Sequence, residues 1–247
     1  MEDLKNLDKL PLEVKDKFMP YLRELLALYP GEIRSVVIYG SAVGKNYLPK
    51  RSDINSAVII DAIGVPQERR ALKMIAHGHR QGIATPLFFT PAYMVSSLDV
   101  FPIEFLEIKE NHVLVFGEDW WAARDIDQKN LRLFCEHEIK GKFFRIRQAY
   151  LEQGLKAGAL QLLLKESLNA LIPIFRNLIR LKNRAVNLDK NAVVRALSES
   201  YSLDSRVFED ILRHQTTGLR ASGAQVEELF AKYLVEIEKL VQAVDSL

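Results

Sequence analysis

The chain has 247 residues, of which 48% are hydrophobic, so it is long enough to bury a large core in one large or two small domains. Its 34 Lys and Arg against 32 Asp and Glu give a net charge of +2, which is too small to indicate nucleic-acid binding on its own. The single cysteine, Cys135, excludes an internal disulfide and a cysteine-cluster metal site. Because there is no membrane-length apolar run and no signal-peptide pattern, we expect a cytoplasmic protein without membrane contact.

The first 60 residues predict a helix followed by two strands. Apolar residues recur at helical spacing across residues 10–29, and Pro30-Gly31 ends that pattern. The apolar run 33–39 is typical of a buried strand and ends at Gly40-Ser41. The polar loop 42–51 leads to a second strand, whose apolar part is residues 57–60.

The turn and loop after the first strand suit phosphate binding. Gly40 lets the backbone approach a ligand closely, and Ser41 offers both an N–H and a hydroxyl to a phosphate oxygen. Lys45, Lys50 and Arg51 give the loop a basic character that would suit a triphosphate. A solvated loop is the alternative explanation for these cations.

The second strand begins with Asp53 and Asn55 at positions i and i+2, so we expect both side chains on one face. With Gly40 and Ser41, these residues resemble the nucleotidyltransferase superfamily, the fold of DNA polymerase β and kanamycin nucleotidyltransferase. The family pattern is a Gly-Ser turn after a strand, then Asp-x-Asp or Asp-x-Glu on the next strand. The chain matches at Gly40, Ser41 and Asp53 and departs at Asn55.

Strands and helices continue to alternate up to about residue 120. The pattern predicts a helix over 66–81, with Pro66 in its first turn, and a short helix over 92–98. Strands are expected over 85–90, 101–108 and 112–116. Residues 98–119 and 131–150 also look like uncharacterised bacterial nucleotidyltransferase-domain proteins with a helical C-terminal half.

The second half of the chain has no convincing strand pattern. We expect helices over residues 127–153, 159–182, 188–201, 205–214 and 225–244. The second of these is hydrophobic around much of its surface, which predicts a central position in a bundle. The fold class is therefore α+β: residues 1–122 form a nucleotidyltransferase-like domain with a mixed sheet, and residues 123–247 form an all-α helical bundle.

The resemblance implies a magnesium site. In the family, two or three carboxylates hold two Mg²⁺ ions, which bind the triphosphate and stabilise the transition state of transfer. Asp53 and Asn55 occupy the catalytic positions, but Asn55 offers only a neutral oxygen. Glu104, on the expected strand 101–108, is the preferred further catalytic carboxylate. Asp53 and Glu104 would then be the metal ligands; Glu107, Asp99 or no residue at all are the alternatives to Glu104.

The missing carboxylate at Asn55 leads to three functional hypotheses. In the first, the protein is a pseudoenzyme that binds a nucleoside triphosphate through Gly40, Ser41, Lys45 and Arg51 and transfers little or nothing. In the second, it is an active Mg²⁺-dependent nucleotidyltransferase acting on a small hydroxylated molecule or a protein. In the third, the helical half is a non-catalytic module that binds RNA or a protein.

Two features of the helical half bear on partners. Residues 123–247 carry 20 Lys and Arg against 16 Asp and Glu, and Arg176, Arg180 and Arg184 recur at helical spacing. These arginines suit RNA or a phosphate, while a solvated helix face is the alternative that we favour. Apolar residues on the bundle surface leave a homodimer open.

Overall fold

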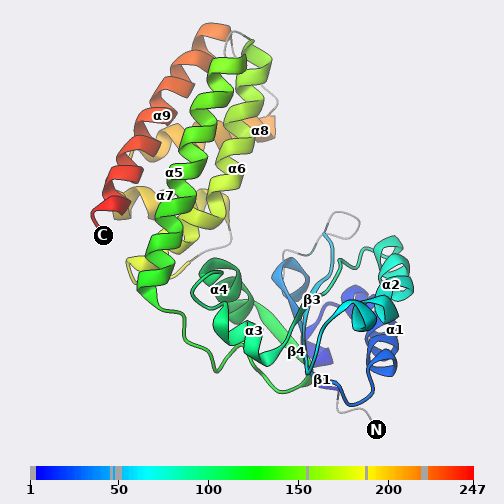
Figure 1. The fold of residues 1–247 in the computed structure, drawn as a ribbon. Helices are drawn as coiled ribbons and strands as arrows, with labels where there is room; N and C mark the ends of the chain where they lie inside the picture. The colour runs from blue at the N-terminus through cyan, green and yellow to red at the C-terminus, as the bar shows by residue number, and fades with distance from the viewer. Residues whose placement is uncertain (1–3, 45–46, 48–51, 154–155, 187–188, 218–221) are drawn as a thin grey trace. The chain divides into compact units, whose positions relative to one another are not determined.

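The computed structural model describes residues 4–44, 47, 52–153, 156–186, 189–217 and 222–247 (Figure 1). The chain divides into two compact units, Met1–Ile126 and Asp127–Leu247. The first contains a mixed sheet with helices and the second is helical, which confirms the α+β prediction.

A four-stranded sheet with the order β3-β2-β1-β4 organises the described part of the first unit. Its strands are β1 (Ile33–Tyr39), β2 (Asn55–Ile60), β3 (Leu87–Phe89) and β4 (His112–Gly117). Strand β1 runs antiparallel to both β2 and β4, whereas β3 is parallel to β2. The mixed sheet that the sequence predicts is therefore present.

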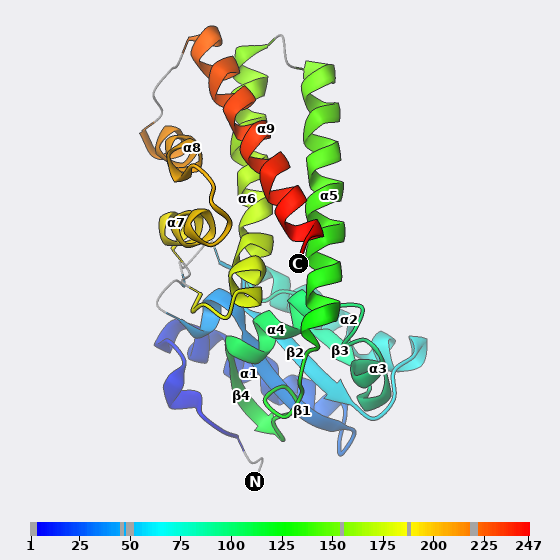
Figure 2. The same cartoon turned by 90° about the vertical axis from the view of Figure 1, so that its left-hand side faces the viewer.

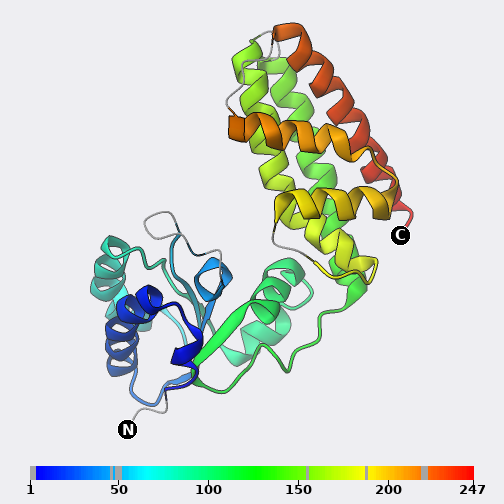
Figure 3. The ribbon, with the colours of Figure 1, turned by 180° about the vertical axis from the view of Figure 1, so that it is seen from behind.

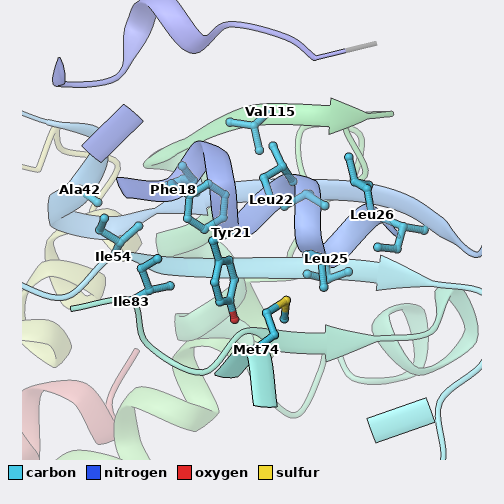
Figure 4. Packing of buried hydrophobic residues seen from close by; sticks show 14 of the residues in the cluster. Phe18, Tyr21, Leu22, Leu25, Leu26, Ala42, Ile54, Met74, Ile83 and Val115 are labelled. Atoms are coloured by element: carbon cyan, nitrogen blue, oxygen red, sulfur yellow. The ribbon is translucent and has the colours of Figure 1, made fainter. Parts of the chain in front are cut away.

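Helices cover both faces of this sheet (Figure 1). On one face, α1 (Leu12–Leu28) and α2 (Val65–Arg80) bury Phe18, Leu22 and Met74 against strand residues such as Val115 (Figure 4). On the other face, α3 (Pro91–Ser96) and α4 (Pro102–Glu110) pack with Trp121 against alternate strand residues. This alternation follows the two-residue period of a strand.

The strand predicted over residues 101–108 is wrong, because this segment belongs to helix α4. Pro102 stands in the first turn, where its missing N–H costs nothing. Phe105 and Ile108, three residues apart, are both buried on the same side of the helix. A short apolar run of this kind fits either a strand or a buried helix, so periodicity alone could not separate them.

The second unit is a bundle of long and short helices. Its described helices are α5 (Gln128–Gln153), α6 (Ala157–Leu181), α7 (Lys190–Tyr201), α8 (Ser205–Thr217) and α9 (Gly223–Asp245). Helix α6 packs against all four of the others, which confirms its predicted central position. The long helices α5, α6 and α9 run side by side (Figure 2), and α7 and α8 lie across them (Figure 3). In the described ranges, no helix has the length and apolar character needed to cross a membrane.

Candidate functional site

The Gly40-Ser41 turn follows the end of β1 and has a defined backbone conformation. Gly40 has a φ of 75°, in the left-handed region that favours glycine, and it begins the 3-10 helix η2 (Gly40–Val43). Its N–H donates to the carbonyl of Asn111, at 3.0 Å. Ala42 is fully buried in the core with Ile54 nearby (Figure 4). Ser41 therefore lies half-buried between two anchored residues.

Asp53 and Asn55 flank Ile54, the buried residue just before β2. Ile54 is fully buried in the core under α1 and α2, and its N–H donates to the Gly82 carbonyl, at 2.8 Å. Because side chains alternate, Asp53 and Asn55 emerge on the opposite face of the sheet. Asp53 is exposed, and Asn55 is half-buried.

The side chains of these two residues approach different neighbours. Asn55 is the register partner of Tyr39, and a Cβ atom on Gly40 would lie 3.7 Å from Asn55 Nδ2. Asp53 lies near the turn before Ile83, the residue that bridges Ile54 in parallel. A Cβ atom on Gly82 in this turn would be 4.0 Å from Asp53 Oδ1. The amide thus faces the Gly-Ser turn, and the carboxylate leans toward a separate turn.

The candidate third carboxylates lie on or before helix α4. Glu104 is exposed on this helix, Glu107 is half-buried on it, and Asp99 is exposed in the preceding turn. The prediction that Glu104 lies on a strand is therefore wrong, because this residue belongs to helix α4. Asn111, which touches the Gly-Ser turn, follows Glu104 by seven residues, about 10 Å along a helix axis.

A two-magnesium centre does not fit the residues that the structure describes. Within these ranges, no group of three or more His, Cys, Asp and Glu side chains could hold a metal ion. Asp53 brings one exposed carboxylate, and the neutral amide of Asn55 is a poor bridge between two dications. The predicted nucleotide contacts Lys45 and Arg51, and also Lys50, lie outside the described residues.

A histidine–aspartate pair, which the sequence did not suggest, lies at the start of β4, beside the end of β1. His112 is the register partner of Tyr39, and its Nε2 lies 3.1 Å from the Asp119 carboxylate. Asp119 also accepts hydrogen bonds from the N–H groups of Trp121 and Ala122. Burial raises the pKa of Asp119, but the Ala122 N–H and His112 outweigh burial, so its pKa is lowered.

Two arginines of the proposed basic stripe are held by neighbours within the second unit. Arg180 donates to Asn177 Oδ1 at 2.9 Å, and Asn177 is fully buried. Arg184 pairs with Glu199 at 3.2 Å on the surface. The arginines are therefore partly engaged in intramolecular contacts, and these contacts do not favour RNA binding.

Comparisons with known proteins identify the fold. No family model matches the sequence, and no curated protein sequence matches it. Among solved structures, the chain is similar to spectinomycin adenyltransferase AAD(9) from Enterococcus faecialis, crystallised with ATP and spectinomycin. The TM-score is 0.56 at 14% identity, over 94% of this chain and 98% of the other. The chain thus has a nucleotidyltransferase fold, as its Gly-Ser turn and Asp53 predict.

Proposed function

We propose that this protein binds a nucleoside triphosphate at the Gly40-Ser41 turn and carries out little or no nucleotidyl transfer. The observation that carries this proposal is the position of Asn55, which stands beside the turn where the family pattern has its second carboxylate. In this proposal the chain keeps Gly40 and Ser41, which would bind phosphate, and lacks the second carboxylate that would help to hold metal ions.

The proposal of nucleotide binding is supported by the backbone geometry of the turn. The positive φ of Gly40 turns the chain so that Ser41 can present its N–H and hydroxyl at the end of β1. The bond from the Gly40 N–H to Asn111 holds this turn against the start of β4. The ATP named for the similar structure supports a nucleotide as the ligand.

The proposal of little or no transfer is supported by the chemistry of the metal ligands. A two-metal centre needs several hard anionic ligands to hold two dications close together. Asp53 supplies one carboxylate, and within the described ranges it belongs to no group of three or more His, Cys, Asp and Glu side chains that could hold a metal ion. The proposal therefore includes no chemical step that depends on a bound metal ion.

A second candidate is adenylyl transfer to a hydroxyl group of a small molecule. It is favoured by the substrate named for the similar structure, spectinomycin, and by the coverage of nearly the whole chain. This candidate requires a carboxylate such as Glu104 or Glu107 to reach the site and Asn55 to be tolerated there.

The test combines binding with a search for product. Thermal unfolding with ATP at 100 times the dissociation constant should show stabilisation of about 2.7 kcal/mol. Ser41→Ala should reduce this stabilisation, whereas Ser246→Ala, which removes an exposed hydroxyl at the end of α9, should not. Incubation with α-labelled ATP and hydroxylated small molecules should give no labelled product. A labelled product would favour the second candidate, and no effect of any nucleotide on unfolding would contradict nucleotide binding.

A further inference from the structure

Asn55 differs from a carboxylate in the direction of the hydrogen bonds that it can make. An ionised Asp only accepts hydrogen bonds, whereas the amide of Asn also carries two N–H donors. The same position can therefore hold a metal ion when it is Asp, or contact an anion directly when it is Asn. The surroundings of the side chain distinguish the two uses.

The donor end of Asn55 faces the turn. Its Nδ2 atom lies 3.7 Å from the place that a Cβ atom on Gly40 would take, and glycine leaves that place empty. A ligand atom seated over Gly40 would be within reach of this N–H group. With the described residues, the Asn55 side chain forms no hydrogen bond of its own.

The Asp53 carboxylate, which is the negative charge of the motif, lies away from the Gly-Ser turn. Asp53 approaches Gly82, on the side of Asn55 away from β1. Residues i and i+2 of a strand are about 6.8 Å apart, so the carboxylate is offset from the turn. Repulsion between Asp53 and a phosphate over Gly40 is therefore weaker than it would be from a carboxylate at residue 55.

The neighbour of Asn55 across the ladder is also neutral. Tyr39 is its register partner, so both side chains lie on the same face of the sheet. Burial raises the pKa of Tyr39, which keeps its hydroxyl protonated at neutral pH. Asn55 and Tyr39 are therefore two neutral groups near the turn that can donate hydrogen bonds.

We propose that Asn55 donates a hydrogen bond directly to a phosphate oxygen of the bound nucleotide, so that the triphosphate binds without a divalent cation. This inference rests on the proposed nucleotide binding and adds the identity of the donor and the independence from metal. Hydrogen bonds to charged oxygens are stronger than neutral ones, so a single well-placed amide contributes measurably.

The test is calorimetric titration of ATP into the full chain, once in EDTA and once in excess Mg²⁺. The wild-type dissociation constant should agree within about twofold between the two conditions. Asn55→Ala should weaken binding about ten- to a hundredfold in both, the loss expected for one hydrogen bond to a charged group. Asn55→Asp should weaken binding most in EDTA, because the new carboxylate repels the phosphate, and Mg²⁺ should restore part of the loss.

Controls keep the outcomes separate. Asn191→Asp makes the same chemical change at an exposed position on α7 and should leave both titrations unchanged. Thermal unfolding without ligand checks that each variant folds. Wild-type binding seen only with Mg²⁺, or wild-type affinity in Asn55→Ala, would overturn the role of Asn55 and leave nucleotide binding intact. No ATP binding in either condition would overturn the proposed function as well.

Discussion

Asn55 Nδ2 lies against Gly40, 3.7 Å from the position that a Cβ atom on this glycine would occupy. The two residues are 15 apart in the sequence and meet because Tyr39 and Asn55 pair in the β1–β2 ladder. The glycine provides the left-handed turn, and the amide stands beside the space that the missing side chain leaves. The conformation of the turn and its contact with residue 55 are therefore linked.

Replacing Gly40 with alanine should destabilise the protein and weaken nucleotide binding. The φ of 75° costs an L-residue about 1–2 kcal/mol, whereas 3.7 Å is an ordinary contact distance for the new methyl group. We expect Gly40→Ala to lower the free energy of unfolding by that amount and to reduce the stabilisation by ATP, both measured by urea denaturation.

Gly44→Ala is the matched control for this turn. Gly44 has an extended backbone with a φ of −131°, and no atom of the described residues lies within 4 Å of its would-be Cβ. Its substitution should change the free energy of unfolding by less than about 0.5 kcal/mol. Equal losses in the two variants would mean that the positive φ of Gly40 is not the source of the effect.

The site illustrates which features of this fold the sequence could predict. The strand over residues 33–39 has the predicted bounds, because a continuous apolar run and a glycine mark both its character and its end. The offset between Asn55 and Asp53 was not predictable. The offset depends on the segments that flank residues 53–55: Gly40 lies near Asn55, and Gly82 lies near Asp53.

The wrong predictions for residues 101–108 and for Glu104 also have a physical cause. Most of this segment is helical in α4, where Phe105 packs against Trp121 and Phe89, and these partners are set by tertiary packing. The position proposed for Glu104 depended on that strand and was lost with it. The pairing of His112 with Asp119 likewise joins the start of β4 to the loop beyond its end, and no local pattern reports it.

Asp119 should make stability depend on acidic pH. Its pKa is lowered in the folded protein, so its contribution is present above the ordinary Asp value of about 3.9 and is lost as pH falls below it. Asp119→Asn should therefore be less stable than wild type at about pH 7, with a difference that shrinks toward about pH 3. Urea denaturation across this range measures the difference.

Asp125→Asn serves as the comparison for that titration. Asp125 is fully exposed and pairs with Lys109 at 3.3 Å, and a surface pair of this kind contributes little. Its substitution should leave the pH dependence of wild type unchanged. A difference between wild type and Asp119→Asn that stays constant with pH would argue against a charged role for Asp119.

In the helical unit, Tyr233 joins α9 to α6 through a buried hydrogen bond. Its hydroxyl lies 3.1 Å from Ser167 Oγ, and the side chain is fully buried. Tyr233→Phe should cost about 1 kcal/mol in the free energy of unfolding. Tyr150→Phe is the control, since Tyr150 stacks on Phe230 through its ring, which the substitution keeps. Similar losses in both variants would show that the Ser167 contact adds nothing.

Gly117 should be the least replaceable glycine of the sheet. It ends β4 with a φ of 77°, and a Cβ atom there would lie 1.9 Å from the carbonyl oxygen of Arg34. That oxygen accepts the N–H of Glu118 at 3.1 Å, so the two strands cannot separate without losing this bond. Backbone strain of about 1–2 kcal/mol and overpacking of about 1–3 kcal/mol together predict a loss of about 2–5 kcal/mol for Gly117→Ala.

Gly31→Ala separates strain from the clash. Gly31 has a φ of 75°, and none of the residues that the structure describes has an atom within 4 Å of its would-be Cβ, so alanine there meets only the backbone cost of about 1–2 kcal/mol. Urea denaturation of the two variants should show Gly117→Ala to be clearly the less stable. If both lose the same free energy, the Arg34 carbonyl can move away at little cost, and the close approach of β1 and β4 at Gly117 is not a rigid feature of the sheet.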